Sequence, residues 1–434
     1  MSLGAELPAA VRPVLRALAN ADRTLRDIRM RPLIVWLHRW VGLLMTVFLI
    51  VVGLTGSLLA FNADLEKWIS PQLFAAKPAP EAKPLDLATL AERAEAAEPH
   101  ASVGYFSLGP EQAFMHVGAR TDPATGKPFS LDFNEMFLDP WTGKELGHRM
   151  GGDLSQGMVN LMPFIYALHM NLALGNWGAL VLGIVALAWT LDCFYAVYLT
   201  FPVVFSRFLS RWKPAWKIKW PASAYRLNFD LHRASGLWLW PLLFIFAWSS
   251  VMFNYNEVYV WVTGKVFDYP SMEQELAPYM LKTPNEHPRL GWRAGLEKAE
   301  QATARAAREN NVTLGAPFGF AYISQFGMYS YSVRSNRDIS DGSWDGFGVW
   351  VDGDTGEVKK VFYPDGEHSG NTVSNWLRAL HFANWHDWLA YRILVCALGL
   401  VITLLSVTGV YIWWTKRRAR QTTAARRSTA VAAS

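Results

Sequence analysis

Four long apolar stretches constrain this chain more than any other feature of its sequence. They cover residues 33–61, 177–201, 237–255 and 389–414, and no other segment of the 434 residues approaches their length. A helix needs about 20 consecutive, mostly apolar residues to cross the hydrocarbon core of a bilayer. The sequence therefore predicts an α-helical membrane protein with four transmembrane helices. The first stretch is expected to remain as a helix, because about thirty Arg-containing residues precede it and no small-residue cleavage site follows it.

The distribution of positive charge predicts the orientation of these helices. Arg and Lys gather before the first stretch, between the second and third stretches, and after the fourth. Such residues are retained on the cytoplasmic side of the membrane. We therefore expect both termini in the cytoplasm and two long segments on the opposite side. The net charge of +5 fits attraction to anionic membrane lipid and requires no nucleic acid as a partner.

The chain reads as two copies of one unit, each made of a helix, an outside segment and a second helix. The first and third stretches open on the same pattern, His38-Arg39-Trp40-Val41-Gly42-Leu43 and His232-Arg233-Ala234-Ser235-Gly236-Leu237. The second and fourth stretches are each approached through Ala-Leu-His, at residues 167–169 and 379–381. Equivalent positions of the two copies are therefore candidates for a shared role.

The two outside segments share an order of elements. Each begins with a helix-period stretch and continues with short alternating runs, which predict β-strands; these are residues 87–98, 103–108 and 113–117 in the first copy and 291–310, 319–324 and 329–334 in the second. Each ends on Asp-x-x-Thr-Gly, at residues 139–143 and 352–356, where Gly supplies the positive φ of a hairpin turn. We predict two small α+β domains, joined to the membrane by Pro-rich linkers at 77–84 and 269–288.

These openings, approaches and hairpin turns resemble the PepSY-associated transmembrane family over residues 33–414. The family includes iron-regulated inner-membrane proteins and bis-haem ferric-siderophore reductases. The resemblance implies a bacterial inner-membrane protein with four helices in two duplicated pairs, two PepSY-like periplasmic domains and a haem-dependent reductase activity. The end of the second stretch departs from the family's common Thr/Ser-Gly-x-x-x-Trp pattern, because it reads Leu191-Asp192-Cys193-Phe194-Tyr195.

The expected division of the chain follows from the stretches, the charges and the resemblance together. It comprises a cytoplasmic segment 1–32, a transmembrane helix 33–62, a first periplasmic PepSY-like domain 63–164, a second helix with its approach 165–202, a basic cytoplasmic loop 203–231, a third helix 232–256, a second periplasmic PepSY-like domain 257–380, a fourth helix with its approach 381–415, and a cytoplasmic tail 416–434.

Four of the ten histidines recur at equivalent positions of the two copies. His38 and His232 lie at the expected cytoplasmic helix ends, and His169 and His381 lie at the outer approaches. A low-spin haem iron takes two axial ligands from opposite sides, and neutral imidazole suits it. A single histidine at a helix end is more often an interfacial anchor. Four in matched pairs favour ligands, so we predict two haem b groups, each with two histidine ligands.

Residues near these histidines support the two sites unequally. Gly42 and Gly236 lie one helical turn after the inner histidines, on the same face, and leave space for a flat porphyrin. Trp385 occupies the corresponding position after His381, which makes His381 the less supported ligand and His386 its competitor.

Charged residues and cysteines add further candidates. Arg39 and Arg233 directly follow the inner histidines and either neutralise haem propionates or serve as ordinary flanking charge. Asp192 lies inside an apolar stretch, where an ionisable group is a functional candidate; its alternative is a pair with a neighbouring Arg or Tyr. Cys193 and Cys396 are expected to pack as small hydrophobic residues. Two cysteines exclude an iron–sulfur cluster or a covalently attached haem on this chain.

The expected function is electron transfer across the membrane. His38 and the end of the first helix at Asn62 are 24 residues apart, about 36 Å of helix, so the two haems would lie in opposite halves of the bilayer. No nucleotide-binding motif occurs, which leaves a quinol or a redox protein as donor. A ferric siderophore or similar metal chelate would be the acceptor, between aromatic walls at 104–106, 320–322 and 344–350.

Two other classes of function remain open. A non-redox membrane protein whose outside domains bind peptides or restrain a protease would contain no haem. A transporter would show helices interrupted by Gly or Pro and charges near the midplane, for which Asp192 and Pro241 are the sequence features.

Overall fold

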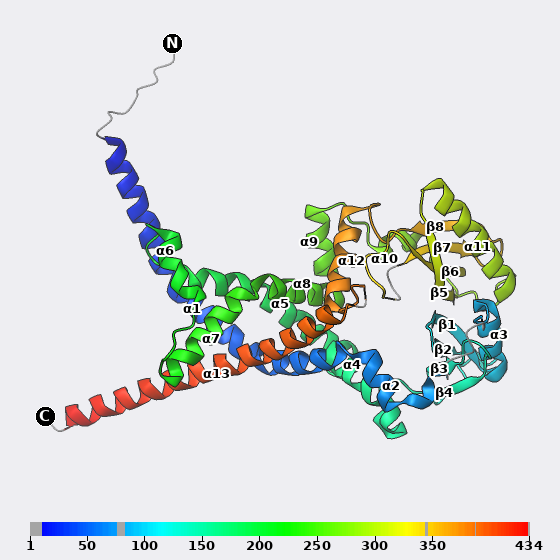
Figure 1. Ribbon diagram of the computed structural model, residues 1–434, viewed down its shortest axis with the longest axis horizontal. Coiled ribbons are helices and arrows are strands. Elements are labelled where there is room, and N and C mark those ends of the chain that lie inside the picture. The colour runs from blue at the N-terminus through cyan, green and yellow to red at the C-terminus, as the bar shows by residue number, and fades with distance from the viewer. Residues whose placement is uncertain (1–10, 76–82, 343–345, 387, 433–434) are drawn as a thin grey trace, which may run out of the picture. The chain divides into compact units, whose positions relative to one another are not determined.

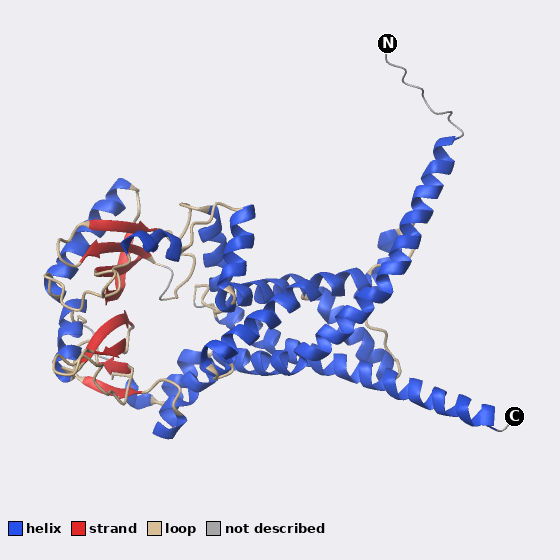
Figure 2. Ribbon diagram, turned by 180° about the vertical axis from the view of Figure 1, so that it is seen from behind, coloured by secondary structure: helices blue, strands red, loops and turns tan. Residues whose placement is uncertain are grey.

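The structure is a computed structural model, and it describes residues 11–75, 83–342, 346–386 and 388–432. The chain divides into two compact units. The first contains Met1–Leu54, Val181–Val251 and Leu398–Ser434, and the second contains Thr55–Leu180 and Met252–Ala397. Helices dominate the first unit, and all strands lie in the second (Figures 1 and 2).

Three helices are long and apolar enough to cross a membrane. They are α1 (Val11–Leu59), α5 (Gly175–Thr200) and α13 (Leu389–Ala432), with apolar spans at Met30–Leu59, Gly175–Thr200 and Leu389–Ala425. A fourth span exists if α7 (Ala224–Trp238) and α8 (Trp240–Asn254) are counted as one, although they meet at an angle of 70°. The chain is therefore a membrane protein with three such helices and one bent pair in its described part.

The bend corrects the prediction of a continuous third helix at 232–256. Pro241 follows Leu239 by two residues and has no N–H to donate to the preceding helical turn, so the ladder of helical hydrogen bonds is interrupted there. Proline is tolerated in the first turn of a new helix, which is where α8 places it.

The apolar helices of the first unit pack through a cluster of buried side chains. It consists of Met45, Leu49, Cys193, Leu243, Ala247, Leu398 and Ile402. A Cβ atom added at Gly53 would lie 2.7 Å from the carbonyl oxygen of Gly399, so the backbones of α1 and α13 approach closely there. Small residues allow this kind of approach between membrane helices. The loop after α5 forms the short helices α6 (Phe208–Trp212) and η4 (Lys213–Trp216).

The second unit contains one antiparallel sheet of eight strands in the order β4-β3-β2-β1-β5-β6-β7-β8. The first copy contributes four strands, and the second copy contributes the other four; their bounds are β1 Ala101–Leu108, β2 Ala113–Ala119, β3 Glu135–Leu138, β4 Glu145–Arg149, β5 Leu314–Ile323, β6 Met328–Ser335, β7 Phe347–Asp352 and β8 Val358–Phe362. All four strand-like runs of the sequence lie in strands. The helices predicted at 87–98 and 291–310 are α3 (Leu87–Ala97) and α11 (Trp292–Glu309), which contact each other along the sheet (Figure 1).

The two halves of the sheet join through β1 and β5, where Tyr105, Phe106 and Ser107 pair with residues 321, 320 and 319. This differs from the expectation of two separate α+β domains. An unpaired strand edge exposes a row of N–H and C=O groups. Here β1 of the first copy pairs with β5 of the second copy, so each strand satisfies groups of the other. Phe106 and Phe320 are fully buried in one apolar cluster that includes residues of α3 and α11, so the two copies share a core.

The hairpin turns are confirmed at both Asp-x-x-Thr-Gly sites. They connect β3 to β4 and β7 to β8, and Gly143 and Gly356 have φ values of 63° and 73°. Asp139 and Asp352 accept hydrogen bonds from the backbone N–H of the Thr three residues later, at 3.1 and 2.9 Å.

Short helices complete the second unit, and in each copy at least one α-helix precedes the sheet elements and another follows them. The first copy has α2 (Asn62–Ile69), η1 (Pro71–Leu73), η2 (Leu154–Gln156), η3 (Met158–Asn160) and α4 (Leu161–Asn171), and the second has α9 (Asn256–Val266), α10 (Met272–Leu276), η5 (Ala277–Tyr279) and α12 (Ser369–His381). The predicted linker at 269–288 therefore contains helical turns, and α10 starts with a capping box between Ser271 and Gln274. Residues 77–82 of the other predicted linker lie outside the described residues.

Candidate functional site

The structure brings together both of the histidine pairs that the duplication predicted. His38 on α1 and His232 on α7 have ring centroids 6.3 Å apart, with ring planes at 61°. His169 on α4 and His381 on α12 have centroids 6.2 Å apart, with planes at 65°. The first pair lies entirely in the first unit and the second pair in the second unit. The two copies thus build two sites of nearly equal geometry.

These separations match the spacing of two imidazoles that bind one metal ion from opposite sides. A metal–imidazole bond is about 2.0 Å, and the ring centroid lies about 1.1 Å behind the ligating nitrogen, which gives about 6.2 Å between centroids on opposite sides of one ion. Edge-to-face packing of two rings spans a wider range, about 4.5–7 Å. The observed 6.3 and 6.2 Å agree with the value for two imidazoles on opposite sides of one ion.

Hydrogen bonds occupy the Nδ1 atom of three of these histidines. His38 Nδ1 lies 2.9 and 3.0 Å from the two carboxylate oxygens of Asp192. His232 Nδ1 lies 3.1 Å from the carbonyl oxygen of Leu405 and 3.0 Å from the hydroxyl of Thr408. A metal-binding histidine commonly has its other ring nitrogen held in this way, which fixes the tautomer and the ring orientation. Nε2 is then the nitrogen that remains for a metal.

The second pair shows the same use of Nδ1. His169 Nδ1 lies 3.0 Å from the hydroxyl of Thr55. The ring also packs closely on α1, because a Cβ atom added at Gly56 would lie 2.9 Å from His169 Cε1. Phe253 contacts His381 edge-on, with centroids 5.2 Å apart. These contacts leave the two rings little freedom to turn.

Glycines beside the inner pair leave open space, as the sequence suggested. A Cβ atom added at Gly42 or at Gly236 would meet no atom within 4 Å outside its own helical backbone. In the described part of the chain, no group of three or more His, Cys, Asp or Glu side chains is arranged to hold a metal ion. Two histidines with free space beside them fit a metal whose other ligands belong to a macrocycle, as in haem. The residues present therefore fit the group that the resemblance implied.

His386 does not take the place of His381. Its side chain is exposed, and its backbone is in the left-handed region with φ at 51°. Helix α12 ends at His381, so Trp385 does not follow it on the same helical face. Trp385 instead packs against Trp376 and Tyr391. The steric objection to His381 that the sequence raised is removed by the break in the helix.

Asp192 and Arg233 have partners that the sequence did not predict. A pair with Arg or Tyr was the alternative to a functional role for Asp192, and the observed partner is His38. Arg233 donates hydrogen bonds to Asp230 and to the backbone carbonyls of residues 214, 215 and 217. These contacts favour a structural role for Arg233, in holding the loop that contains η4, over a contact with a propionate. Arg39 is half-buried directly after His38, and its role stays a prediction.

Most aromatic residues of the segments that the sequence proposed as walls for a chelate are buried in the sheet. Phe106, Phe320, Tyr322 and Trp350 are buried, and Tyr105 is half-buried. Burial raises the pKa of Tyr322 to about 12, with a further contribution from neighbouring carboxylates, so its phenol is neutral. Trp344 lies outside the described residues. Phe106, Phe320 and Tyr322 belong to the core cluster that includes residues of α3 and α11, whereas Trp350 packs with Leu276 and Met328 in a separate cluster.

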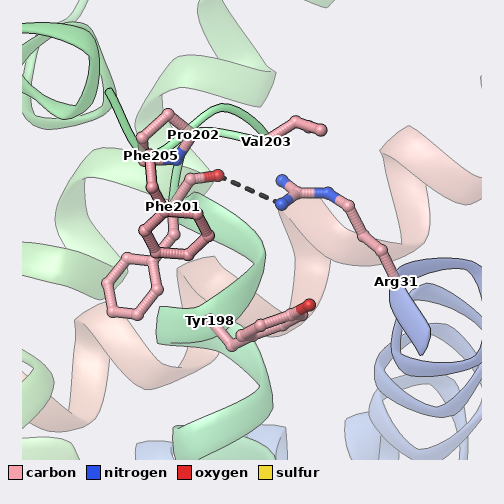
Figure 3. Close-up of a pocket in the computed structure, with 6 residues that line it drawn as sticks. All are labelled: Arg31, Tyr198, Phe201, Pro202, Val203 and Phe205. Atoms are coloured by element: carbon pink, nitrogen blue, oxygen red, sulfur yellow. Dashed lines mark hydrogen bonds between the residues drawn. The ribbon is translucent and has the colours of Figure 1, made fainter. Parts of the chain in front are cut away.

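A small hollow near the end of α5 is separate from the histidines. Its lining comprises Arg31, Tyr198, Phe201, Pro202, Val203 and Phe205. Arg31 donates a hydrogen bond to the carbonyl oxygen of Phe201 at 3.1 Å (Figure 3). It donates another to the carbonyl oxygen of Leu199 at 2.7 Å. An arginine at this position satisfies carbonyls left free at a helix C-terminus and offsets its partial negative charge. The arrangement is that of a helix cap.

Comparison with known proteins adds one match. The family model described as the PepSY-associated TM region matches residues 35–416. This range contains all four paired histidines and every strand of the sheet. No curated protein matches the chain.

Proposed function

Because the chain belongs to the PepSY-associated transmembrane family, we propose that it is a haem-containing reductase of the bacterial inner membrane. It would pass electrons across the membrane to a periplasmic ferric siderophore or similar metal chelate. The observation that carries the proposal is the pairing of four histidines at ring separations of 6.3 and 6.2 Å. When bound, haem would supply one-electron redox chemistry at each pair.

The chain's own residues would hold and orient the cofactors. His38 and His232 would hold one haem, and His169 and His381 would hold the other. Asp192, Thr408 and Thr55 hold three of the rings through Nδ1, which would leave Nε2 as the nitrogen that binds the iron. The apolar side chains of the surrounding helices exclude water, and a low dielectric strengthens the influence of each nearby charge.

The proposed partners lie on opposite sides of the membrane. The clusters of Arg and Lys would keep both termini and the loop 203–231 in the cytoplasm, next to anionic lipid. The sheet would then be periplasmic. A quinol or a redox protein would be the electron donor, because the sequence has no nucleotide-binding motif. Reduction of the chelated iron to Fe(II) weakens its binding by hard oxygen donors and releases it.

A transporter is the second candidate, and one observation favours it. The bend of 70° between α7 and α8 resembles the broken helices that line transport sites. Transport does not require bound haem, so the two candidates differ in a measurable property.

The test is Fe(II) production by the purified protein in lipid vesicles. The protein is reduced without oxygen, freed of excess reductant and mixed with a ferric hydroxamate chelate, and Fe(II) is trapped with a colour-forming ferrous chelator. We expect His38→Ala and His381→Ala to lower the yield of Fe(II) at least tenfold. His287→Ala, which changes an exposed histidine of the second unit, is the matched control and should behave as wild type. Equal yields in all four proteins would exclude the proposed function.

A further inference from the structure

Chemically different groups hold the two rings of the inner histidine pair. His38 Nδ1 lies 2.9 and 3.0 Å from the two carboxylate oxygens of Asp192. His232 Nδ1 lies 3.0 Å from the Thr408 hydroxyl and 3.1 Å from the carbonyl oxygen of Leu405. With Nε2 reserved for a metal, His38 donates its Nδ1 hydrogen to an anion, and His232 donates its own to neutral oxygens.

The internal duplication places Asp192 and Thr408 at equivalent positions. Each lies on the last helix of its copy, α5 or α13, and each contacts the inner histidine of that copy. Residues 192–197 read Asp-Cys-Phe-Tyr-Ala-Val, and residues 408–413 read Thr-Gly-Val-Tyr-Ile-Trp. The first copy therefore has a carboxylate where the second has a hydroxyl.

The carboxylate of Asp192 is largely shielded from water. Its side chain is only 10% exposed and belongs to an apolar helix. A hydrogen bond to an ionised acceptor is roughly twice as strong as one between neutral groups, and a poorly hydrated carboxylate is little screened. A carboxylate partner also makes an imidazole a more basic metal ligand. His38 is therefore both the more firmly oriented and the more basic ring of the pair.

We propose that Asp192 is a positioning residue, which makes His38 the ligand that retains the inner haem and leaves His232 as the exchangeable ligand. This assignment rests on the proposed function, because it requires a haem at the inner pair. His38 then retains the haem when the ring of His232 is absent, whereas His232 does not retain it when the ring of His38 is absent.

Removal of the His232 ring would leave a space for a small ligand. The ring packs against α13, where a Cβ atom added at Gly409 would lie 3.4 Å from His232 Cε1. The space left behind has the size of an imidazole and lies one helical turn before the open space at Gly236. A small molecule of matching shape can enter an engineered space of this kind, so imidazole in solution should take the place of the side chain.

The first experiment counts haem per chain and records the absorption spectrum of purified variants. His38→Ala should retain one haem, because the inner site has lost its main ligand. His232→Ala should retain two, one of them with the high-spin bands of iron that has a single axial ligand, and added imidazole should restore the low-spin bands. Equal haem content in the two variants, or the reverse order, would overturn the proposal.

A second experiment separates the charge of Asp192 from its shape. Asp192→Asn keeps the size and a hydrogen-bond acceptor, and it should weaken haem binding at the inner pair about 10–100-fold, measured as haem transfer to excess apomyoglobin. Thr408→Val leaves the Leu405 carbonyl as an acceptor for His232 and should weaken binding less. Thr190→Ser, which changes another buried polar residue of α5, is the control and should match wild type.

Thr408→Asp keeps the test decisive if Asp192→Asn fails to fold. Combined with His38→Ala, it gives His232 a carboxylate partner and should restore the second haem. The proposal is overturned if Asp192→Asn weakens haem binding no more than Thr408→Val does, or if Thr408→Asp leaves His38→Ala with one haem. Wild-type protein without haem would instead overturn the proposed function itself.

Discussion

Space beside the inner histidines depends on single glycines. Gly42 and Gly236 each follow a histidine by four residues, and added Cβ atoms there would meet no neighbouring atom within 4 Å. Gly56 is different, because its missing side chain makes room for the ring of His169. The same residue type therefore leaves open space at the inner pair, where we expect the cofactor, and allows close packing of His169 on α1 at the outer pair.

A larger side chain at Gly42 tests the first purpose. The Cβ atom of Gly42→Leu would meet no neighbouring atom within 4 Å, and the rest of the side chain would extend into the space in which we expect a porphyrin. Bound haem should fall from two per chain toward one, measured by pyridine haemochrome absorbance against protein concentration. Gly264→Leu is the matched control, because Gly264 is also helical with open space at its Cβ but lies on α9. Equal haem content in the two variants would show that the space beside His38 is not used.

At the residue scale, the duplication made the histidine pairs predictable. Matched positions in two copies identify residues that share a role without any knowledge of their packing. The contact of His38 with Asp192 was not predictable, because it joins residues 154 positions apart and depends on how α5 faces α1. The burial of Tyr322 and Trp350, which were proposed as walls for a chelate, was likewise not predictable, since alternation along a strand shows two faces but not which of them is covered.

At the scale of elements, turns and helix breaks set the geometry of both units. Leu172, Ala173 and Ala383 have positive φ values between 54° and 56°, and they separate α4 from α5 and α12 from α13. A left-handed residue at the end of a helix stops it. His169 and His381 thereby stand on short helices of their own. Each hairpin turn likewise depends on one glycine of positive φ.

Substitution of a turn glycine should destabilise the sheet. Gly356 has φ at 73°, and an added Cβ would lie 2.8 Å from Lys298 Cγ. The left-handed conformation costs about 1–2 kcal/mol for a residue with a Cβ atom, so Gly356→Ala should lower the free energy of unfolding by about that amount. Denaturant unfolding of the full-length protein, followed by circular dichroism of the strands, measures the change.

The control for this substitution is another strand glycine. Gly118→Ala in β2 meets no atom within 4 Å and has no positive φ, so its stability should stay within about 0.5 kcal/mol of wild type. A loss in Gly118→Ala as large as that in Gly356→Ala would show that the turn conformation is not the cause.

Local patterns predicted the elements better than their connections. Alternation and turn residues located the strands of both copies, and apolar length located the long helices. The bend at Leu239 was not predicted, because the apolar run continues through Pro241. The length of an apolar run indicates that a segment can lie in lipid, but it does not show whether the helix is continuous. The joining of β1 to β5 was missed because pairing of two edges has no local pattern.

At the scale of the whole molecule, charge determines the expected topology. The three clusters of Arg and Lys lie in the two terminal segments and in the loop between the second and third apolar stretches, next to the apolar helices. The segments that contain the sheet have no such cluster next to these helices. The positive-inside rule then separates the sheet from the termini. This arrangement would expose the sheet to chelates outside the cytoplasm.

Cysteine labelling in intact spheroplasts tests this topology. In a background in which Cys193 and Cys396 are replaced by Ala, Ser155→Cys and Ser210→Cys each place one thiol at an exposed position. A membrane-impermeant maleimide should label Ser155→Cys directly and Ser210→Cys only after the membrane is permeabilised. The reverse pattern would place the sheet in the cytoplasm and contradict the proposed direction of electron flow.

The most direct test of the central claim is the optical spectrum of the purified protein, oxidised and dithionite-reduced, with haem quantified per chain. The protein must be produced in cells supplied with haem and shown to be folded. We expect two haems with low-spin bands, and the loss of one in each of His38→Ala and His381→Ala. A folded protein without haem, or variants that both keep two haems, would contradict the assignment of the histidine pairs as axial ligands.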